Sequence, residues 1–210
     1  FITGDISGRA ALVYGTVLGC LGVFALSTYT NRLTLVVALL GFFFYVVVYG
    51  VFKRRSVHGT VVGSISGAVP PVVGYVAVTN HFDLAAGLLF LILVLWQMPH
   101  FYAIATFRSK DYAAASIPVL PIKKGIYETK VQIILYILAF TATVLALSAT
   151  GYTGIAYLVV MSVMCLAWLR LGLKGFGTKN DSAWARKVFG FSLITLLVFS
   201  VMISLESFLP

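Results

Sequence analysis

Charged residues are scarce in this sequence. Asp, Glu, Lys and Arg make up 10% of the 210 residues, hydrophobic residues make up 60%, and only six residues are acidic. A soluble domain of this length needs a far more polar surface, so the composition excludes the soluble globular class. Cysteine is rare too: Cys20 and Cys165 lie in separate apolar runs, without partners at metal-ligand spacing. The sequence therefore predicts neither a disulfide framework nor a zinc site, and both residues are expected to be small buried hydrophobes.

The positive charge of the chain, +9 in total, is not of the kind that binds nucleic acid. The basic residues form short clusters between apolar runs of membrane-spanning length. This pattern is typical of the positively charged cytoplasmic loops of membrane proteins. We therefore expect a lipid bilayer, and no nucleic acid, as the surroundings of this chain.

Seven apolar segments reach the roughly 20 residues that a membrane-spanning helix needs. The runs are continuous and lack the alternating pattern of outer-membrane strands, so helices are preferred to a β-barrel. We predict an all-α, polytopic membrane helical bundle that forms a single transmembrane domain over residues 1–210. The predicted spans are Ala10–Tyr29, Leu33–Phe52, Gly59–Val78, Leu84–Thr106, Val131–Ala149, Thr153–Leu173 and Val188–Phe208.

The distribution of Lys and Arg predicts the orientation of these spans. On one side of the predicted spans lie 14 of the 15 basic residues, and Arg32 alone lies on the other side. The positive-inside rule then places the start of the chain in the cytoplasm and the C-terminus outside. The cytoplasmic connections Phe107–Lys130 and Lys174–Lys187 are also the long ones, and long loops often carry function. We therefore expect the working face to be cytoplasmic.

The second predicted span ends in a polar and basic cluster. Tyr49 and Lys53 are four residues apart, so on a continuing helix they share one face at the membrane boundary, and Arg54 follows directly. Lysine binds a diphosphate as a point charge, and arginine binds it through its planar guanidinium. The alternative is that Lys53, Arg54 and Arg55 only anchor the topology, and the spacing alone favours this anchor.

A second polar cluster follows the long apolar helix that starts at Leu84. Here Arg108 and Lys110 precede Asp111. These residues form either a surface ion pair of little energetic weight, or part of a magnesium site. Mg²⁺ usually takes one or two carboxylates and leaves the remaining positions to substrate phosphates. Because the whole chain has six acidic residues, a cytoplasmic metal site built from these residues alone is short of ligands.

Polar side chains also interrupt the end of this apolar helix. Trp96, Gln97, His100 and Tyr102 lie close together, and Pro99 removes a backbone hydrogen bond there. Histidine is the commonest metal ligand and a ready proton carrier, so His100 is a candidate for an iron-porphyrin contact or for acid–base chemistry. A lone histidine in a helix is more often a structural residue, and in that case His100 would take no part in the reaction.

The third predicted span combines small residues with a proline pair. Gly63 and Gly67 lie among serine and alanine, and Pro70 and Pro71 follow. Small residues at spacings of three and four permit close helix contact. The prolines are expected to break or kink the helix, which a membrane interior tolerates where neighbours or a cavity satisfy the freed carbonyls. A packing kink and a cavity-lining role are equally supported.

Three long stretches of the chain resemble a known family. They are VVYGVFKRRSVHGTVVGSISGAVPPVVGY (Val47–Tyr75), WQMPHFYAIATFRSKDYAAASIPVLP (Trp96–Pro121) and WARKVFGFS (Trp184–Ser192). Through nearly its whole length the chain resembles the UbiA-type intramembrane prenyltransferases, and in particular their haem-specific branch, the protohaem IX farnesyltransferases. Strings of this length are far more specific than a short motif.

The resemblance implies a nine-helix bundle in a bacterial cytoplasmic membrane, of which the seven predicted spans are the last seven. The first two helices would lie upstream of Phe1, with the Asn/Asp-rich motif that the superfamily uses as its main Mg²⁺–diphosphate site. That motif has no counterpart in these 210 residues. The resemblance thus implies that this chain alone holds half of an active site and is inactive.

The activity that the resemblance implies joins the farnesyl group of farnesyl diphosphate to a vinyl group of haem B. Water adds in the process, and the products are haem O and pyrophosphate. Asp111 would be the one metal ligand here, and Phe107 stands where the wider superfamily has a second aspartate. His100 and Trp96 would face the porphyrin. The residues implied for diphosphate binding and catalysis are Tyr49, Lys53, Arg54, Arg108, Lys110 and Asp111.

The resemblance also implies a partner, since a haem A synthase or a terminal oxidase assembly would receive the product. Two other functions stay open. A UbiA-type enzyme acting on a quinone or chlorophyll precursor is disfavoured by the missing aspartate pair. A transporter would carry ionisable groups near mid-membrane, on a path between both sides. The nearly charge-free outer end of this chain fits a reaction chamber that opens on one side better.

Overall fold

The computed structural model describes residues 7–208. Within this range seven helices are long and apolar enough to cross a membrane, which confirms the predicted all-α polytopic bundle. The spans are α1 (Gly8–Tyr29); α2 (Arg32–Phe43), continued by the π-helical turn η1 (Phe44–Tyr49) and by α3 (Gly50–Arg55); α4 (Gly59–Thr79); α5 (Leu84–Phe107); α8 (Gly125–Ala149); α9 (Ile155–Leu173), continued by η2 (Lys174–Gly177); and α10 (Asp181–Leu205). Two short helices, α6 (Ser109–Ala114) and α7 (Leu120–Lys123), connect α5 to α8.

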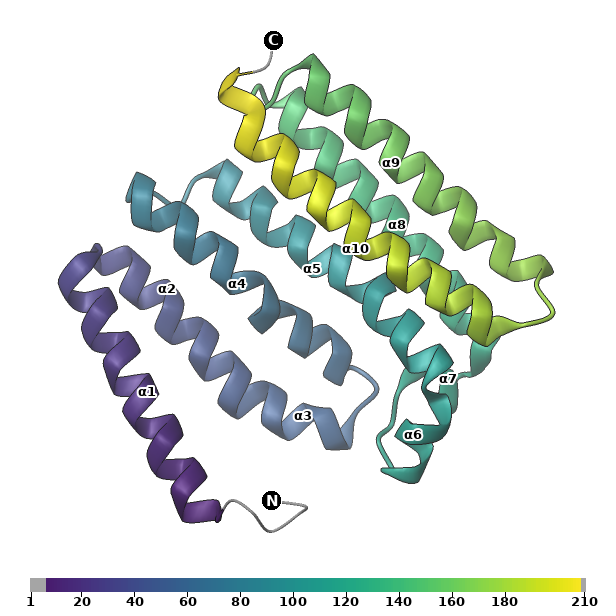
Figure 1. Ribbon diagram of the computed structural model, residues 1–210, viewed down its shortest axis with the longest axis horizontal. Helices are drawn as coiled ribbons and strands as arrows, with labels where there is room; N and C mark the ends of the chain where they lie inside the picture. Colours follow the sequence, from purple (N-terminus) through teal and green to yellow (C-terminus); the bar gives the residue numbers. More distant parts are fainter. Residues whose placement is uncertain (1–6, 209–210) are drawn as a thin grey trace.

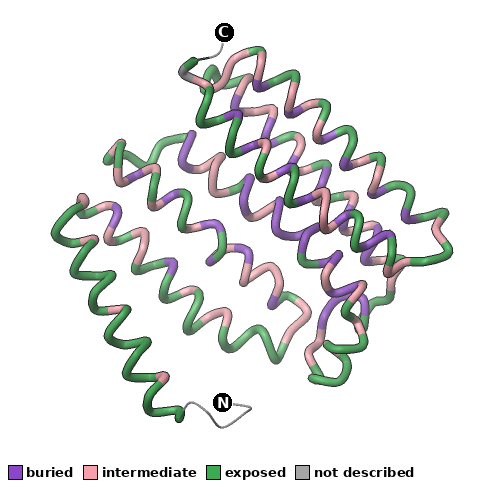
Figure 2. The backbone as a smooth tube through the Cα atoms, viewed as in Figure 1, coloured by how far each residue is buried: buried purple, intermediate pink, exposed green. Residues whose placement is uncertain are grey.

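Helix α5 lies at the centre of the molecule. It packs against α4 on one side and against α8 and α10 on the other, while α1 lies at the far edge beside α2 (Figure 1). Buried residues concentrate on α5 and on the helices around it (Figure 2). In the most apolar stretch of α5 half of the residues are buried, whereas in the most apolar stretch of α1 no residue is buried. The elements next to α5 are therefore the ones able to build a site.

The prediction that both cysteines are buried is half correct. Cys165 on α9 is buried, whereas Cys20 on α1 is exposed. Helix α1 buries no residue in the described structure, because α2 is its main neighbour. Its apolar side chains, such as Leu12 and Phe24, face outward instead. The apolar run predicted a membrane helix correctly but carried no information about which helices surround it.

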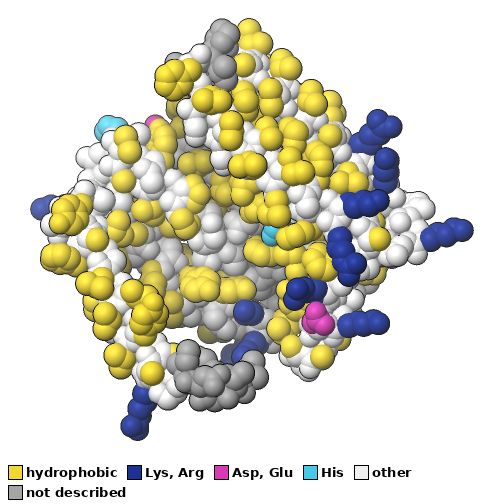
Figure 3. Space-filling view, in the orientation of Figure 1, with side chains coloured by type: hydrophobic (Ala, Val, Ile, Leu, Met, Phe, Trp, Pro, Cys, Tyr) yellow, Lys and Arg dark blue, Asp and Glu magenta, His cyan; other side chains and the backbone are white. Residues whose placement is uncertain are grey.

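The connections fall at two opposite ends of the bundle, as the alternation of charge predicts. The α3–α4 turn, the segment with α6 and α7, and the η2–α10 turn share one end (Figure 1). Lys and Arg side chains gather towards this end, here named the cationic end (Figure 3). The chain is thus an integral multi-pass membrane protein with strongly unequal ends.

Two helices begin earlier than hydropathy predicts. We predicted spans from Val131 and Val188, but α8 begins at Gly125 and α10 at Asp181. The extra turns are polar and make their own contacts: Lys130 Nζ lies 2.6 Å from the carboxylate of Asp181. The Lys130 ammonium also lies 5.6 Å from the ring centre of Trp184. Hydropathy marks where lipid ends, whereas a helix can continue beyond the lipid where its polar residues make contacts of this kind.

The proline pair does not break α4, so of the two predicted effects, a break or a kink, the break is wrong. The helix continues from Gly59 to Thr79 with Pro70 and Pro71 inside it. Each proline lacks an N–H and frees the carbonyl four residues earlier, at Ser66 and Gly67. Both of these residues line a cavity together with Pro70. Of the two roles predicted for this stretch, the structure supports the cavity-lining one.

The opposite end of α4 is tied to α5 by Asp83. The carboxylate of Asp83 accepts a hydrogen bond from the backbone N–H of Ala86 at 3.0 Å and one from the hydroxyl of Tyr75 at 2.8 Å. These hydrogen bonds, the backbone one first, hold the pKa of the Asp83 carboxyl below its usual value. The contact caps α5 and fixes the entry of the chain into the central helix.

Candidate active site

A cavity of about 870 Å³ lies between α2, η1, α3, α4 and α5. It begins at the cationic end, beside Lys53 and Pro118, and extends along α4 from Gly59 to Val73. At 1.5 Å per residue, this stretch of α4 is roughly 20 Å long. Its lining is largely apolar, and on the face drawn in Figure 3 apolar side chains surround the hollowed centre. The cavity is therefore long, mostly apolar and basic at one end.

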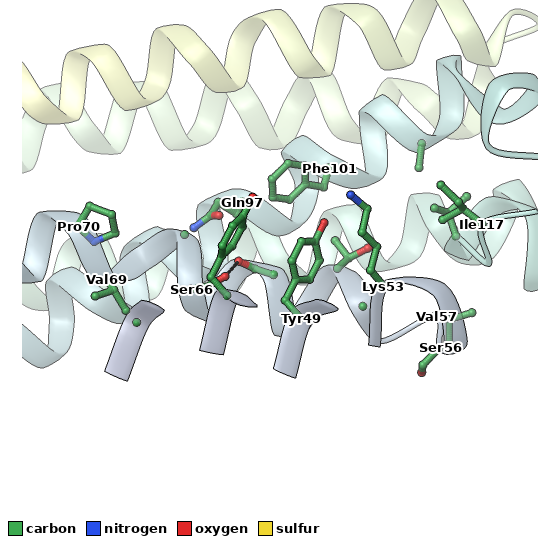
Figure 4. A pocket seen from close by; sticks show the side chains of 18 of the residues that line it. Tyr49, Lys53, Ser56, Val57, Ser66, Val69, Pro70, Gln97, Phe101 and Ile117 are labelled. Atoms are coloured by element: carbon green, nitrogen blue, oxygen red, sulfur yellow. Dashed lines mark hydrogen bonds between the residues drawn. The ribbon is translucent and has the colours of Figure 1, made fainter. Parts of the chain in front are cut away.

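Tyr49 and Lys53 lie together at the basic end of the cavity. Both line it, and the Lys53 ammonium lies 5.4 Å from the ring centre of Tyr49, so the predicted shared face is confirmed. They rise side by side towards the helix that carries Gln97 and Phe101 (Figure 4). Tyr49 is the last residue of η1, a π-helical turn, and π-helical turns are found frequently at functional sites. No pattern in the sequence predicts this wider turn.

Glycines on α4 let the neighbouring chain approach closely. A Cβ at Gly59 would lie 3.0 Å from Lys53 Cα, and one at Gly63 would lie 2.9 Å from the ring of Tyr49. A Cβ at Gly67 would lie only 2.2 Å from Oε1 of Gln97. The small residues predicted to permit close helix contact therefore do so along one stripe of α4. The stripe positions three polar side chains of the cavity.

Gln97 lines the cavity, although no role in the site was predicted for it from the sequence. Its Nε2 donates to the carbonyl of Ser64 at 3.2 Å and to that of Leu93 at 3.0 Å. Both N–H groups of the Gln97 amide are thereby used, so the orientation of the amide is fixed. The side chain is buried and lines the cavity. A signal was present, because Gln97 and Phe101 are four residues apart and share one face of α5.

Trp96 and His100 lie on another face of α5, against α10. The indole N–H of Trp96 donates to the backbone carbonyl of Ser192 at 2.8 Å, and Nδ1 of His100 lies 2.8 Å from the hydroxyl of Ser192. Neither residue lines the cavity. Phe101 does, and its ring lies 5.3 Å from that of His100, centre to centre. The predicted porphyrin contact of Trp96 and His100 stays a prediction.

Arg54 faces a second, smaller space. It lines a cavity of about 470 Å³ at the cationic end, with Arg55 and Lys123 among the other lining residues. No acidic residue lines this cavity. Lys53 and Arg54 are adjacent in sequence and were both predicted to bind the diphosphate. In the structure they line two neighbouring cavities. Ile117 and Pro118 line both.

Arg108, Lys110 and Asp111 lie near the start of α6 and are exposed. They line neither cavity, although Tyr112 lines the larger one. Among residues 7–208, no group of three or more His, Cys, Asp or Glu side chains is placed to hold a metal ion. The described residues therefore do not form a metal site, and Asp111 stays predicted as a single ligand.

The sequence matches the model of the UbiA prenyltransferase family over residues 1–196. The chain belongs to this family. It is similar to proteins named protoheme IX farnesyltransferase 2 from three Pseudomonas sources. The identities are 54% for Pseudomonas paraeruginosa PA7, over 98% of this chain and 70% of the relative; 52% for Pseudomonas fluorescens Pf0-1, over 100% and 71%; and 53% for Pseudomonas aeruginosa UCBPP-PA14, over 98% and 70%.

A solved structure supports the fold independently. It is described as a digeranylgeranylglyceryl phosphate synthase in membranes, and it covers 98% of this chain and 72% of its own, with a TM-score of 0.80. The identity is 18%, so the likeness concerns the arrangement of the helices alone. A membrane prenyltransferase bundle is therefore established for this chain by sequence and fold.

The contact between Gly67 and Gln97 can be tested by substitution. Gly67→Ala places a methyl group where Gln97 Oε1 lies, so the amide has to move and its two hydrogen bonds to buried carbonyls weaken. We expect the free energy of unfolding to fall by about 1–3 kcal/mol. Thermal unfolding of the purified protein in detergent measures this change.

Gly74→Ala is the matched control on the same helix, because nothing lies within 4 Å of a Cβ there. Alanine is the better helix former, so this variant is expected to be neutral or more stable by up to about 1 kcal/mol. Equal unfolding temperatures for the two variants would contradict the proposed packing of Gln97 against Gly67.

Proposed function

We propose that this protein transfers the farnesyl group of farnesyl diphosphate to a vinyl group of haem B; water then adds to the cation left on the former vinyl group, giving haem O, pyrophosphate and a proton. The observation that carries the proposal is the identity of more than half of the residues with protoheme IX farnesyltransferases over nearly the whole chain. The cavity supplies a physical basis, because it is largely apolar and has a lysine at one end.

The apolar part of the cavity suits the isoprenoid chain. Pro70 and Val73 of α4 and Phe101 of α5 line it, and little water is stable between such walls. Farnesyl transfer separates an allylic cation from a diphosphate, and a cation formed in a wet site would react with water at once. A water-poor cavity protects it until the vinyl group attacks.

The basic end of the cavity suits the diphosphate. The ammonium of Lys53 is exposed there beside the hydroxyl-bearing ring of Tyr49. Positive charge next to the leaving group stabilises the negative charge that develops as the carbon–oxygen bond breaks. We place the diphosphate at Lys53 and Tyr49, and we assign to Arg54, Arg108 and Lys110 the supporting cationic field at the same end.

A magnesium ion bound with the diphosphate would neutralise further charge on the leaving group. The described residues offer it Asp111 as a single carboxylate. We therefore propose that Asp111 holds the ion only together with diphosphate oxygens and with ligands outside residues 7–208.

We also propose an orientation for the protein in the cell membrane. The basic end would face the cytoplasm of a bacterial inner membrane, where a soluble diphosphate substrate can enter, and this follows from the positive-inside rule. The product would pass to a haem A synthase or to assembly of a terminal oxidase. Residues 1–210 would form one transmembrane domain.

Incubation of the full-length membrane protein with haem B and farnesyl diphosphate tests the proposed function. We expect haem O and pyrophosphate in equal amounts, identified by chromatography and mass spectrometry. Quinone precursors offered in the same assay serve as competing acceptors. Prenylation of a quinone precursor, with haem B left unchanged, would show that the prenyl acceptor is a quinone precursor and that haem B is not the substrate.

Replacement of single cations tests the position of the diphosphate. Lys53→Ala removes the charge at the mouth of the larger cavity, so KM for farnesyl diphosphate should rise about 10–100-fold, the value of one charged hydrogen bond. Arg54→Ala should raise KM less, because Arg54 lines the smaller cavity. Arg170→Ala, which removes an exposed cation that lines neither cavity, is the control. Equal KM values for all three variants and the unmodified enzyme would leave Lys53 as a topology anchor.

Asp111→Asn tests the proposed metal ligand. The substitution keeps size and removes the charge that binds Mg²⁺, so turnover should fall by about tenfold or more, with no loss of folded protein. Glu128→Gln is the matched control, because Glu128 lies at the same end and accepts a hydrogen bond from Gln132 at 3.0 Å. Unchanged haem O production by Asp111→Asn, at unchanged dependence on Mg²⁺, would remove Asp111 from the site.

A further inference from the structure

The smaller cavity at the cationic end lies between the end of α3 and the segment that holds α6 and α7. Three cations line it: Arg54, Arg55 and Lys123. Within residues 7–208 the one ion pair joins Lys130 to Asp181, so none of these three cations has a carboxylate partner in that range. Like charges around one space repel each other, and together they attract an anion. The cavity therefore has the charge of an anion-binding site.

Ser116 lines this cavity at the end of α6. Its φ is 54°, in the left-handed region. Its N–H donates to the carbonyl of Ala113 at 3.0 Å, and the N–H of Ile117 donates to the carbonyl of Tyr112 at 3.0 Å, which is the hydrogen-bond pattern of a Schellman motif. Glycine usually occupies the left-handed position of this motif, because a side chain is strained there. The turn itself therefore does not require serine, whose hydroxyl adds a hydrogen-bond donor to the lining.

The two cavities share a wall. Ile117 and Pro118 line both, and Ile117 lies at the same end of the larger cavity as Lys53 (Figure 4). The Schellman hydrogen bonds hold the backbone of this wall in a defined position. On the other side, Lys53 of the larger cavity directly precedes Arg54 of the smaller one. A ligand in the smaller cavity would therefore lie beside the place assigned to the diphosphate.

The two proposed substrates carry different anions. The diphosphate is assigned to Lys53 and Tyr49 in the larger cavity. Haem B carries two propionate carboxylates on one side of its macrocycle, and charged groups of this kind are costly to place in the apolar part of a bilayer. Arginine binds a carboxylate through two parallel hydrogen bonds, and lysine binds it as a point charge. Three cations without an acidic residue, at the end of the bundle, suit these two carboxylates.

We propose that the smaller cavity binds the propionates of the porphyrin substrate, with Arg55 and Lys123 as the main cations and the Ser116 hydroxyl as an additional donor. This site rests on the proposed function, which names haem as the acceptor. Arg55, Lys123 and Ser116 thereby bind the acceptor separately from the diphosphate. The vinyl groups lie on the side of the macrocycle opposite the propionates. Binding of the propionates here would therefore point the vinyl groups away from the smaller cavity and into the bundle.

Titration with iron-free protoporphyrin IX, followed by its fluorescence, tests the propionate site without farnesyl transfer. The full-length protein in neutral detergent is used, and the lack of iron removes any contribution from an iron ligand. The matched ligand is the dimethyl ester of protoporphyrin IX, in which both propionates are uncharged. The free acid should bind about 10–100-fold more tightly than the ester, as expected for one charged hydrogen bond.

Arg55→Gln and Lys123→Gln test the cations. Each removes one charge from the smaller cavity, so Kd for the free acid should rise about tenfold while Kd for the ester stays unchanged. Arg54 is kept, because it is also assigned to the cationic field around the diphosphate. Lys179→Gln is the matched control, because Lys179 is an exposed cation at the same end that lines neither cavity. This control should leave both Kd values unchanged.

Ser116→Gly separates ligand binding from folding. Glycine relieves the left-handed backbone, so the unfolding temperature should stay equal or rise. The hydroxyl is lost, so Kd for the free acid should nevertheless rise about 2–10-fold, the value of one neutral hydrogen bond. Kd for the ester should change less. An unchanged Kd for the free acid would remove Ser116 from the site.

The outcomes distinguish the propionate site from the proposed function. If the free acid and the ester bind equally, or if Arg55→Gln and Lys123→Gln behave like Lys179→Gln, the propionate site is overturned, and haem O production by the unmodified protein would leave the proposed function standing. If these two variants lose binding of inorganic pyrophosphate instead of the porphyrin, the smaller cavity is a diphosphate site and the proposal is wrong. If the unmodified protein binds neither porphyrin, the propionate site and haem as the acceptor are both overturned.

Discussion

The close approach of α4 to its neighbours is the contact on which the candidate site depends. Side chains at Gly63 or Gly67 would collide with Tyr49 or Gln97. With glycine there, the polar side chains on either side of α4 pack directly against its backbone. In a membrane, where lipid tails are as apolar as leucine, such packing and interhelical hydrogen bonds hold helices together. Gly63 and Gly67 thus determine how closely α4 packs against its neighbours, and they also form part of the cavity wall.

Helix α5 separates two chemical environments. Gln97 and Phe101 face the cavity beside α4 (Figure 4). Trp96 and His100 instead contact Ser192 of α10. Side chains that are adjacent in sequence serve different faces because successive helical positions are about 100° apart. In the proposed reaction one face of α5 would serve the isoprenoid and the other the porphyrin. Phe101, which contacts both, would mark the reacting centre.

Much of this architecture could be predicted from the sequence. Continuous apolar runs predicted all seven spans, and a spacing of four predicted that Tyr49 and Lys53 share a face. These predictions succeeded because they depend on nearby residues and on the bilayer. The starts of α8 and α10 were predicted too late, because the pair of Lys130 and Asp181 joins residues far apart in the chain.

The same limit applies to the site. Nothing local indicates that Ser192 bonds to His100, since 92 residues separate them. The π-helical turn that ends at Tyr49 and the fit of Gln97 against Gly67 also depend on the packed neighbours. The sequence therefore predicted which residue types could carry chemistry, whereas their hydrogen-bond and packing partners depend on the fold. The proline pair shows the reverse case, since α4 continues through residues that locally predict a break or a kink.

In the proposed reaction the cavity along α4 holds the farnesyl chain, with the diphosphate at Lys53. A structure of the full-length protein with a non-hydrolysable farnesyl diphosphate analogue would show where this substrate binds. We expect density for the diphosphate beside Lys53 and Tyr49, with the chain running past Gln97 and Phe101 towards Val73. An analogue bound in the smaller cavity beside Arg54, or on the α10 side of α5, would contradict it.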